Sequence, residues 1–229
     1  LRTQRAHSVL VLLPDLANPF FSTILEGISR NLSQQGYSML IASTKQVHDS
    51  GERLIDYLDD ARADGMIVLD GGLELEIVEM LETAPQADRI LFACEWVDGA
   101  NFPSVRCENR RGTSAAVNHL YDIGHRKIAH VTGPEGNVLS STRKDAFVAE
   151  MAKLNLALKP EWIIAGDFSL AAGCLAAQAW IALDVRPTAV FCASDQLAMG
   201  FIAELSRHGI KVPDDVSVMG FDDIDFAEQ

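Results

Sequence analysis

Acidic residues gather just beyond a short apolar run near the end of the sequence. Asp222, Asp223 and Asp225 follow the run at 216–219 and Gly220. A β-branched apolar run that ends at a glycine predicts a buried strand, and open α/β sheets bind ligands beyond the carboxyl ends of their strands. An ionised carboxylate only accepts hydrogen bonds, so it can hold the hydroxyl groups of a small molecule. We interpret these acids as candidate ligand anchors, with a solvated acidic turn as the alternative.

The sequence lacks the common signatures of catalysis and of metal binding. The sequence contains no dinucleotide-binding glycine motif, phosphate-binding loop, nucleophile elbow or zinc-protease helix motif. Its four cysteines show no metal-type spacing, which predicts buried, reduced thiols. The acidic cluster lacks the alternating acids and distal glutamate of a calcium-binding loop. We therefore expect no enzyme activity, no cofactor and no metal site.

Charge and composition limit the class of protein further. The chain has 229 residues, 48% of them hydrophobic, which is enough for one large or two small folded domains. The net charge of −13 repels phosphate backbones, so the chain alone should not bind nucleic acid. No run of about 18 apolar residues and no signal-peptide pattern occur, which favours a cytoplasmic protein without a membrane partner.

Apolar runs alternate with amphipathic stretches along the whole chain. We expect strands at 7–13, 37–42, 66–69, 89–93, 127–132, 162–165, 188–192 and 216–219, and helices at 20–36, 48–62, 73–81, 111–123, 141–155, 170–183 and 195–208. This βαβ rhythm predicts an α/β fold in which parallel sheets carry helices on both faces. We place the crossing between two lobes near 122–127, giving lobes at 7–124 and 125–229 and a linker remnant at 1–6. Two such lobes would enclose a ligand cleft.

Five ordered motifs carry a family resemblance. They are PDLANPFF at 14–21, DGMI at 64–67, GHRKIA at 124–129, PTAVFCASD at 187–195 and GFDD at 220–223. Together they resemble the effector-binding core of the lactose-repressor (LacI/GalR) family of bacterial transcription regulators, over essentially the whole chain. The turn at 166–168 is most similar to the branch that contains the cytidine and purine repressors.

The resemblance implies a fold, partners and a mechanism. The family has two lobes like those of type I periplasmic binding proteins, and the lobes close on a small effector, here a sugar or nucleoside. It forms homodimers and binds operator DNA through an N-terminal helix-turn-helix module, which this sequence does not include. The family also continues beyond the position of Gln229. A periplasmic sugar- or nucleoside-binding protein for transport remains the alternative, because it would share the fold and the cleft.

Three residues are expected at the centre of the effector site from this resemblance. Arg143 matches an arginine whose planar fork of donors reaches ligand hydroxyls. Asp222 matches the cleft carboxylate, and Phe168 matches an aromatic residue that stacks on the bound ring. The alternatives are a surface ion pair for Arg143 and core packing for Phe168.

The resemblance places further residues around this centre. Leu139 offers no polar contact, so guanine and hypoxanthine are not expected as effectors. Glu108 stands where similar members have aspartate, and Ser194 stands where many have asparagine, so the effector of this chain can differ from theirs. The remaining expected contacts are Phe20 and Phe21 on the opposite wall, Asp70, Asn137 and Asp195.

Overall fold

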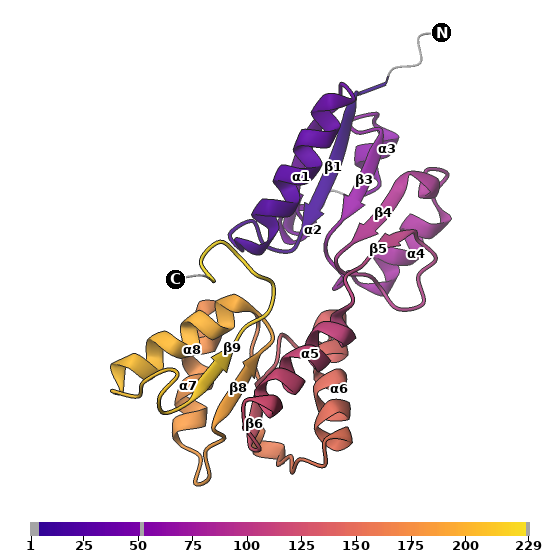
Figure 1. Ribbon diagram of the computed structural model, residues 1–229. Coiled ribbons are helices and arrows are strands. Elements are labelled where there is room, and N and C mark those ends of the chain that lie inside the picture. The colour runs from indigo at the N-terminus through magenta and orange to yellow at the C-terminus, as the bar shows by residue number, and fades with distance from the viewer. Residues whose placement is uncertain (1–4, 51–52, 228–229) are drawn as a thin grey trace. The chain divides into compact units, whose positions relative to one another are not determined.

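The computed structural model describes residues 5–50 and 53–227, apart from the side chains of 48–50. It divides into two compact units, Leu1–Cys107 and Glu108–Gln229 (Figure 1). Most of the expected linker remnant at 1–6, and Gln229, lie outside the described residues. Among the described helices, none combines the length and the apolar character that crossing a membrane would require.

The first unit is a parallel sheet with helices on both faces. Its strands are β1 (Ser8–Leu13), β2 (Ser38–Ser43), β3 (Gly65–Val68), β4 (Ile90–Ala93) and β5 (Ser104–Val105), in the order β2-β1-β3-β4-β5. Its helices are α1 (Phe20–Gln34), α2 (Thr44–Ser50), α3 (Asp56–Asp59), α4 (Leu75–Thr83) and the 3₁₀ turn η1 (Ala87–Arg89). Each β-strand therefore ends at the same edge of the sheet.

Alternation along β1 explains why both faces of this sheet are covered. Leu10 and Leu12 belong to the apolar cluster under α3 and α4, whereas Val11 and Leu13 belong to the cluster under α1. Successive strand side chains point to opposite faces, so a continuous apolar run needs cover on both sides. The Asn18 side chain accepts a hydrogen bond from the amide of Phe20 at 3.0 Å, which fixes the start of α1.

The second unit repeats this architecture. Its strands are β6 (Ile128–Val131), β7 (Ile163–Ile164), β8 (Ala189–Cys192) and β9 (Ser217–Met219), paired in parallel in the order β7-β6-β8-β9. Its helices are α5 (Asn109–Asp122), α6 (Val138–Lys153), α7 (Leu170–Ile181), α8 (Asp195–Arg207) and the 3₁₀ turn η2 (Pro160–Trp162).

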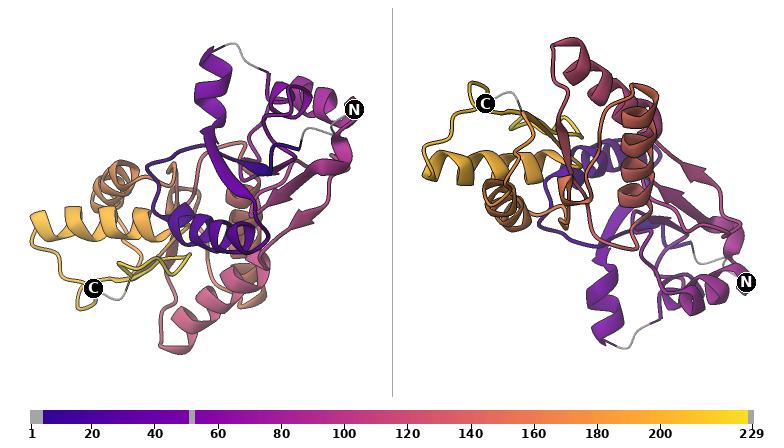
Figure 2. Two further views of the ribbon diagram at one scale, coloured as in Figure 1. Left: turned by 90° about the horizontal axis from the view of Figure 1, so that it is seen from above. Right: turned by 90° about the horizontal axis from the view of Figure 1, so that it is seen from below.

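Two helix pairs cover the two faces of the second sheet. Val190 and Cys192 pack into the cluster of α7 and α8, and Ala189 and Phe191 pack into the cluster of α5 and α6. Figure 1 shows the two pairs on opposite sides of the strands, and α7 and α8 lie side by side in both views of Figure 2. The strand residues of β8 are all buried, as expected for a doubly covered parallel strand.

Two details differ from the sequence prediction. In place of the helix expected at 48–62 there are α2, which begins earlier at Thr44, and the short α3; Leu54, Ile55 and Leu58 are buried, and residues 51–52 lie outside the described residues. The units divide between Cys107 and Glu108, ahead of the crossing predicted near 122–127. The reason is that α5 packs on α6 and buries Val117 and Leu120 in the second unit.

Candidate functional site

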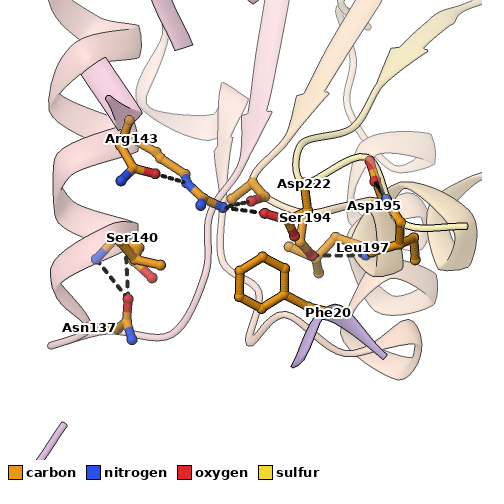
Figure 3. Close-up of polar contacts among 12 residues, drawn as sticks. Phe20, Asn137, Ser140, Arg143, Ser194, Asp195, Leu197 and Asp222 are labelled. Carbon is orange, nitrogen blue, oxygen red and sulfur yellow. Dashed lines mark hydrogen bonds and ion pairs between the residues drawn. The ribbon is translucent and has the colours of Figure 1, made fainter. Parts of the chain in front are cut away.

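Arg143 is the polar centre of the second unit. Only 4% of the residue is exposed, and its Nε donates to Oδ1 of Asn109 at 3.0 Å. Its Nη1 donates to the carbonyl oxygen of Ala193 and lies 3.4 Å from Oδ1 of Asp222 (Figure 3). The guanidinium carbon also lies 3.9 Å from the centre of the Phe221 ring, within cation–π range. The surface ion pair considered as an alternative is therefore wrong, because this arginine is buried.

Asp222 follows β9 and faces Arg143 in an unusual backbone conformation. Its φ of 112° is rare for a residue other than glycine, and such strain concentrates at functional sites. Its side chain is 9% exposed. Burial raises the pKa of Asp222 to about 7, the nearby Asp195 adds to the rise, and Arg143 opposes it. Asp222 therefore changes charge near neutral pH.

Asp195 holds the loop that carries Asp222, and the adjacent Ser194 caps α8. The Ser194 side chain accepts from the amide of Leu197 at 3.3 Å and caps α8. Oδ2 of Asp195 accepts from the amide of Ile224 at 3.0 Å, and a Cβ added to Gly220 would lie 2.1 Å from its Oδ1. Burial raises the pKa of Asp195 as well. Asp195 thus positions the loop of Asp222, and Ser194 caps the helix that Asp195 begins.

Phe168 lies beside Arg143, on the turn between β7 and α7. Its ring centre is 5.9 Å from the Arg143 guanidinium carbon, and its φ of 69° is left-handed. A Cβ added to Gly133 would lie 2.2 Å from Cζ of Phe168, so the ring requires a glycine there. The ring is half-buried and packs partly against the core. Both sequence interpretations, stacking on a ligand ring and core packing, are compatible with this position.

Asn137 and Glu108 stand at helix starts. Oδ1 of Asn137 accepts from the amides of Leu139 at 2.8 Å and Ser140 at 3.1 Å, which caps α6. This carbonyl oxygen is therefore engaged with the helix. Glu108 is exposed and precedes α5 without a side-chain capping bond. It adjoins Asn109, the residue that contacts Arg143.

Of the three site residues predicted in the first unit, Phe20 and Phe21 begin α1 and Asp70 follows β3. Phe21 is 4% exposed and packs into the cluster of Val11 and Leu13, and Phe20 meets it edge to face with ring centres 5.2 Å apart. Asp70 follows β3 and accepts from Oγ1 of Thr44 at 2.5 Å and from the amide of Gly72 at 2.8 Å. These contacts fix the carboxylate of Asp70 at the carboxyl edge of the sheet.

Three residues around these groups were missed by sequence reasoning. Asn109 and Phe221 contact Arg143, and each adjoins a residue that was singled out. Glu95 is 6% exposed, and its side chain accepts a hydrogen bond from the amide of Gly71, the residue after Asp70, at 2.8 Å. Adjacency to Glu108 and Asp222 was the available signal for the first two.

The arrangement in the second unit is suited to binding. An arginine, a carboxylate of raised pKa and an aromatic ring together match a small ring that carries hydroxyl groups. The described residues contain no group of three or more potential metal ligands.

Comparison with known proteins decides the family. Residues 6–229 match the family described as periplasmic binding proteins and sugar binding domain of the LacI family. The chain belongs to this family. The resemblance found in the five motifs and the predicted fold class are both confirmed.

Relatives within this family are named as regulators. The chain is 33% identical to the HTH-type transcriptional repressor CytR of Escherichia coli K12 over 99% of this chain and 66% of CytR. It is 30% identical to the repressor PurR of Vibrio campbellii over 100% of this chain and 68% of PurR. The chain thus spans slightly less than two thirds of CytR.

A solved relative is also similar in fold. The structure of a LacI-family transcriptional regulator from Lactobacillus casei with bound glucose superposes with a TM-score of 0.83 at 28% identity, covering 96% of this chain and 82% of that one. These relatives are named as transcriptional regulators and repressors.

Proposed function

We propose that this chain is the effector-binding and dimerisation domain of a cytoplasmic transcriptional repressor. It senses a small sugar or nucleoside, and the effector changes operator affinity by favouring one hinge angle between the lobes over another. A coupling of about 1–3 kcal/mol between effector and operator is enough for a regulatory response. The family membership and the repressor names of the relatives support this proposal.

The buried pair of Arg143 and Asp222 is the main observation in support of effector binding. Burying two charges costs desolvation energy, and an apolar pair of similar volume is often as stable or more so. The pair stands at the carboxyl edge of the second sheet, beside the half-buried ring of Phe168 and on a strained backbone. A costly polar group in that position is best explained by a ligand that uses it.

The surface of α7 supports the homodimer. The helix contains no charged residue, and Leu170 and Leu175 are 47% and 65% exposed on it. On the neighbouring α8, Ile202 is 38% exposed. A helix that is apolar on its outer face as well requires cover, and a second copy of the chain would supply it. Sedimentation should give a dimer of the 25.0 kDa chain, and Leu175→Glu should shift it to monomer.

A ligand screen by thermal shift tests the effector. Monosaccharides, nucleosides and purine bases are added singly, and a true effector at 100 times its dissociation constant stabilises the chain by about 2.7 kcal/mol. Arg143→Lys should abolish that gain because a point charge cannot reproduce the planar fork. Arg186→Lys is the matched control, since Arg186 is exposed on the same unit and its guanidinium lies 5.5 Å from the Trp180 ring. A ligand that stabilises Arg143→Lys as much as the wild type would contradict the proposed effector site.

Operator binding separates the repressor from the transport alternative. The full gene product should bind its own upstream DNA in gel shift, and the effector should change that affinity several-fold or more. A full product that binds the same ligand, is exported and shows no DNA binding would support the solute-binding protein instead.

A further inference from the structure

Ser140, in the first turn of α6, has a buried hydroxyl that no described residue satisfies. The residue is 5% exposed, and its Oγ has no hydrogen-bond partner in the described part of the chain. The adjacent Ser141 differs, because it is exposed and its Oγ donates to the carbonyl oxygen of Val138 at 3.1 Å. A buried hydroxyl without a partner is destabilising, and such groups are rare in folded proteins. The hydroxyl of Ser140 therefore needs an explanation.

The hydroxyl lies where the candidate site is built. A Cβ added to Gly133 would lie 2.3 Å from Oγ of Ser140 and 2.2 Å from Cζ of Phe168. The hydroxyl and the ring edge thus meet over the same glycine, in the loop that follows β6. Ser140 also precedes Arg143 by three residues, so the two side chains share one face of α6. Figure 3 shows both on this helix.

The other candidates in this loop are already engaged or apolar. Oδ1 of Asn137 accepts from two backbone amides, one of them the amide of Ser140 itself. Leu139 has no polar atom in its side chain. Within the first turn of α6, Ser140 therefore offers a buried hydroxyl beside Phe168 that is without a hydrogen-bond partner among the described residues.

We propose that Ser140 determines effector specificity by hydrogen bonding, through Oγ, to a hydroxyl on the ring that packs against Phe168. This rests on the proposed function. A serine hydroxyl donates one hydrogen bond and accepts others, so it can pair with a ring hydroxyl that also donates to a carboxylate. The shared ligand chemistry is a hydroxylated ring, which occurs in a free monosaccharide and in the ribose of a nucleoside. A site built to pair with a hydroxyl rejects the ligand that lacks it.

The test compares Ser140→Ala with Ser141→Ala by calorimetry. The probes are ribose, glucose, cytidine and adenosine, each with its available monodeoxy analogues. For whichever of these binds the wild type, Ser140→Ala should weaken binding about tenfold, equal to about 1.4 kcal/mol. Ser141→Ala should leave affinity within about twofold. One deoxy analogue should bind the wild type and Ser140→Ala equally, which would identify the hydroxyl and distinguish sugar from nucleoside.

Thermal unfolding without ligand distinguishes binding from packing. Ser140→Ala removes an unpaired hydroxyl and adds a better helix former, so its melting temperature should stay level or rise. A lowered melting temperature with unchanged affinity would mean that Ser140 only packs, and would overturn this proposal alone. If none of the nucleosides and monosaccharides binds the wild-type chain, the proposed function fails and the role of Ser140 fails with it.

Discussion

Two carboxylates, each just beyond a strand end, meet different environments in the two units. Asp70 follows β3 in the first unit and accepts short hydrogen bonds from the buried Thr44 and from the exposed Gly72. Asp222 follows β9 in the second unit, is 9% exposed, and contacts Arg143 at 3.4 Å. Each unit therefore places an acid just beyond a strand end, and of these two acids it is Asp222 that contacts a buried arginine.

A place beyond a strand end does not by itself determine the role of a carboxylate, because that role depends on the partners and on burial. Asp70 is held by neutral donors from its own unit, so it acts as a fixed part of the sheet edge. Asp222 has a pKa raised to about 7 by burial, and its partner is a buried arginine. A buried carboxylate whose pKa is near neutral, because its arginine partner offsets only part of the effect of burial, can change its protonation state when a ligand binds. The second unit is therefore where we expect changes of charge to have the largest effects.

Removing the arginine should have the largest effect. Arg143→Met at pH 8 should lower the free energy of unfolding by roughly 3–5 kcal/mol, because it leaves Asp222 buried without its partner. The loss should be smaller at pH 5, where Asp222 takes up a proton. Denaturant unfolding measures both, and Arg186→Met should change stability by less than about 0.5 kcal/mol. An equal loss at pH 5 and pH 8 would contradict a charged origin.

The next largest effect is the contribution of His130 to the dependence of stability on pH. It is fully buried between Phe147 and Phe191, with ring centres 5.0 Å from each. Burial lowers the pKa of His130 to about 4. The unfolded chain binds a proton near pH 6.5 while the folded chain does not, so His130 costs stability as pH falls from about 6.5 to 4, by about 3 kcal/mol in total.

His130→Phe isolates this contribution. Relative to the wild type, the variant should gain stability progressively between pH 6.5 and 4, because it has no proton to take up. Its stability at neutral pH should be lower, because the hydrogen bond from Nδ1 to the carbonyl of Phe191 is lost. Asp222 acts in the opposite direction over the same range, since its folded pKa is raised and protonation favours the folded state. If the stability of His130→Phe and of the wild type changed equally with pH between 6.5 and 4, the assignment of this pH dependence to His130 would be contradicted.

Effector affinity should depend on pH through Asp222. If the ionised carboxylate accepts effector hydroxyls, binding requires loss of the proton, and affinity should rise about tenfold per pH unit up to about pH 7 and level off above it. Asp222→Asn should bind weakly and without this slope. Calorimetry from pH 5.5 to 8 measures it, and an affinity that falls as pH rises would mean that the neutral acid is the binding form.

The first unit should show the smallest effect. Thr44→Val removes the hydrogen bond to Asp70 and should cost about 1 kcal/mol of stability. Thr83→Val is a matched control, because that hydroxyl donates only to exposed helix carbonyls. If Thr44→Val cost as much as Arg143→Met, the contrast between the two carboxylates would not hold.

Much of the fold was predictable because local patterns are repeated along the chain. The apolar runs of β1 and β8 and the capped start of α1 lie within a residue or two of their predicted bounds. The division at 107–108 was not predictable, because α5 is an ordinary amphipathic helix whose partner is α6. The residues expected at the effector site remain predictions as binding residues, although Arg143, Asp222 and Phe168 do lie together.

The sequence by itself determined the α/β class, the family and the identity of the central arginine, carboxylate and aromatic ring. These follow from periodicity and from ordered motifs, which are properties of neighbouring residues. Only the tertiary structure decided that Arg143 is buried on Asn109, that Asp195 holds the loop of Asp222, and that the Ser140 hydroxyl has no hydrogen-bond partner among the residues that the structure describes. Burial and hydrogen-bond satisfaction depend on residues far apart in the chain, so no local pattern encodes them.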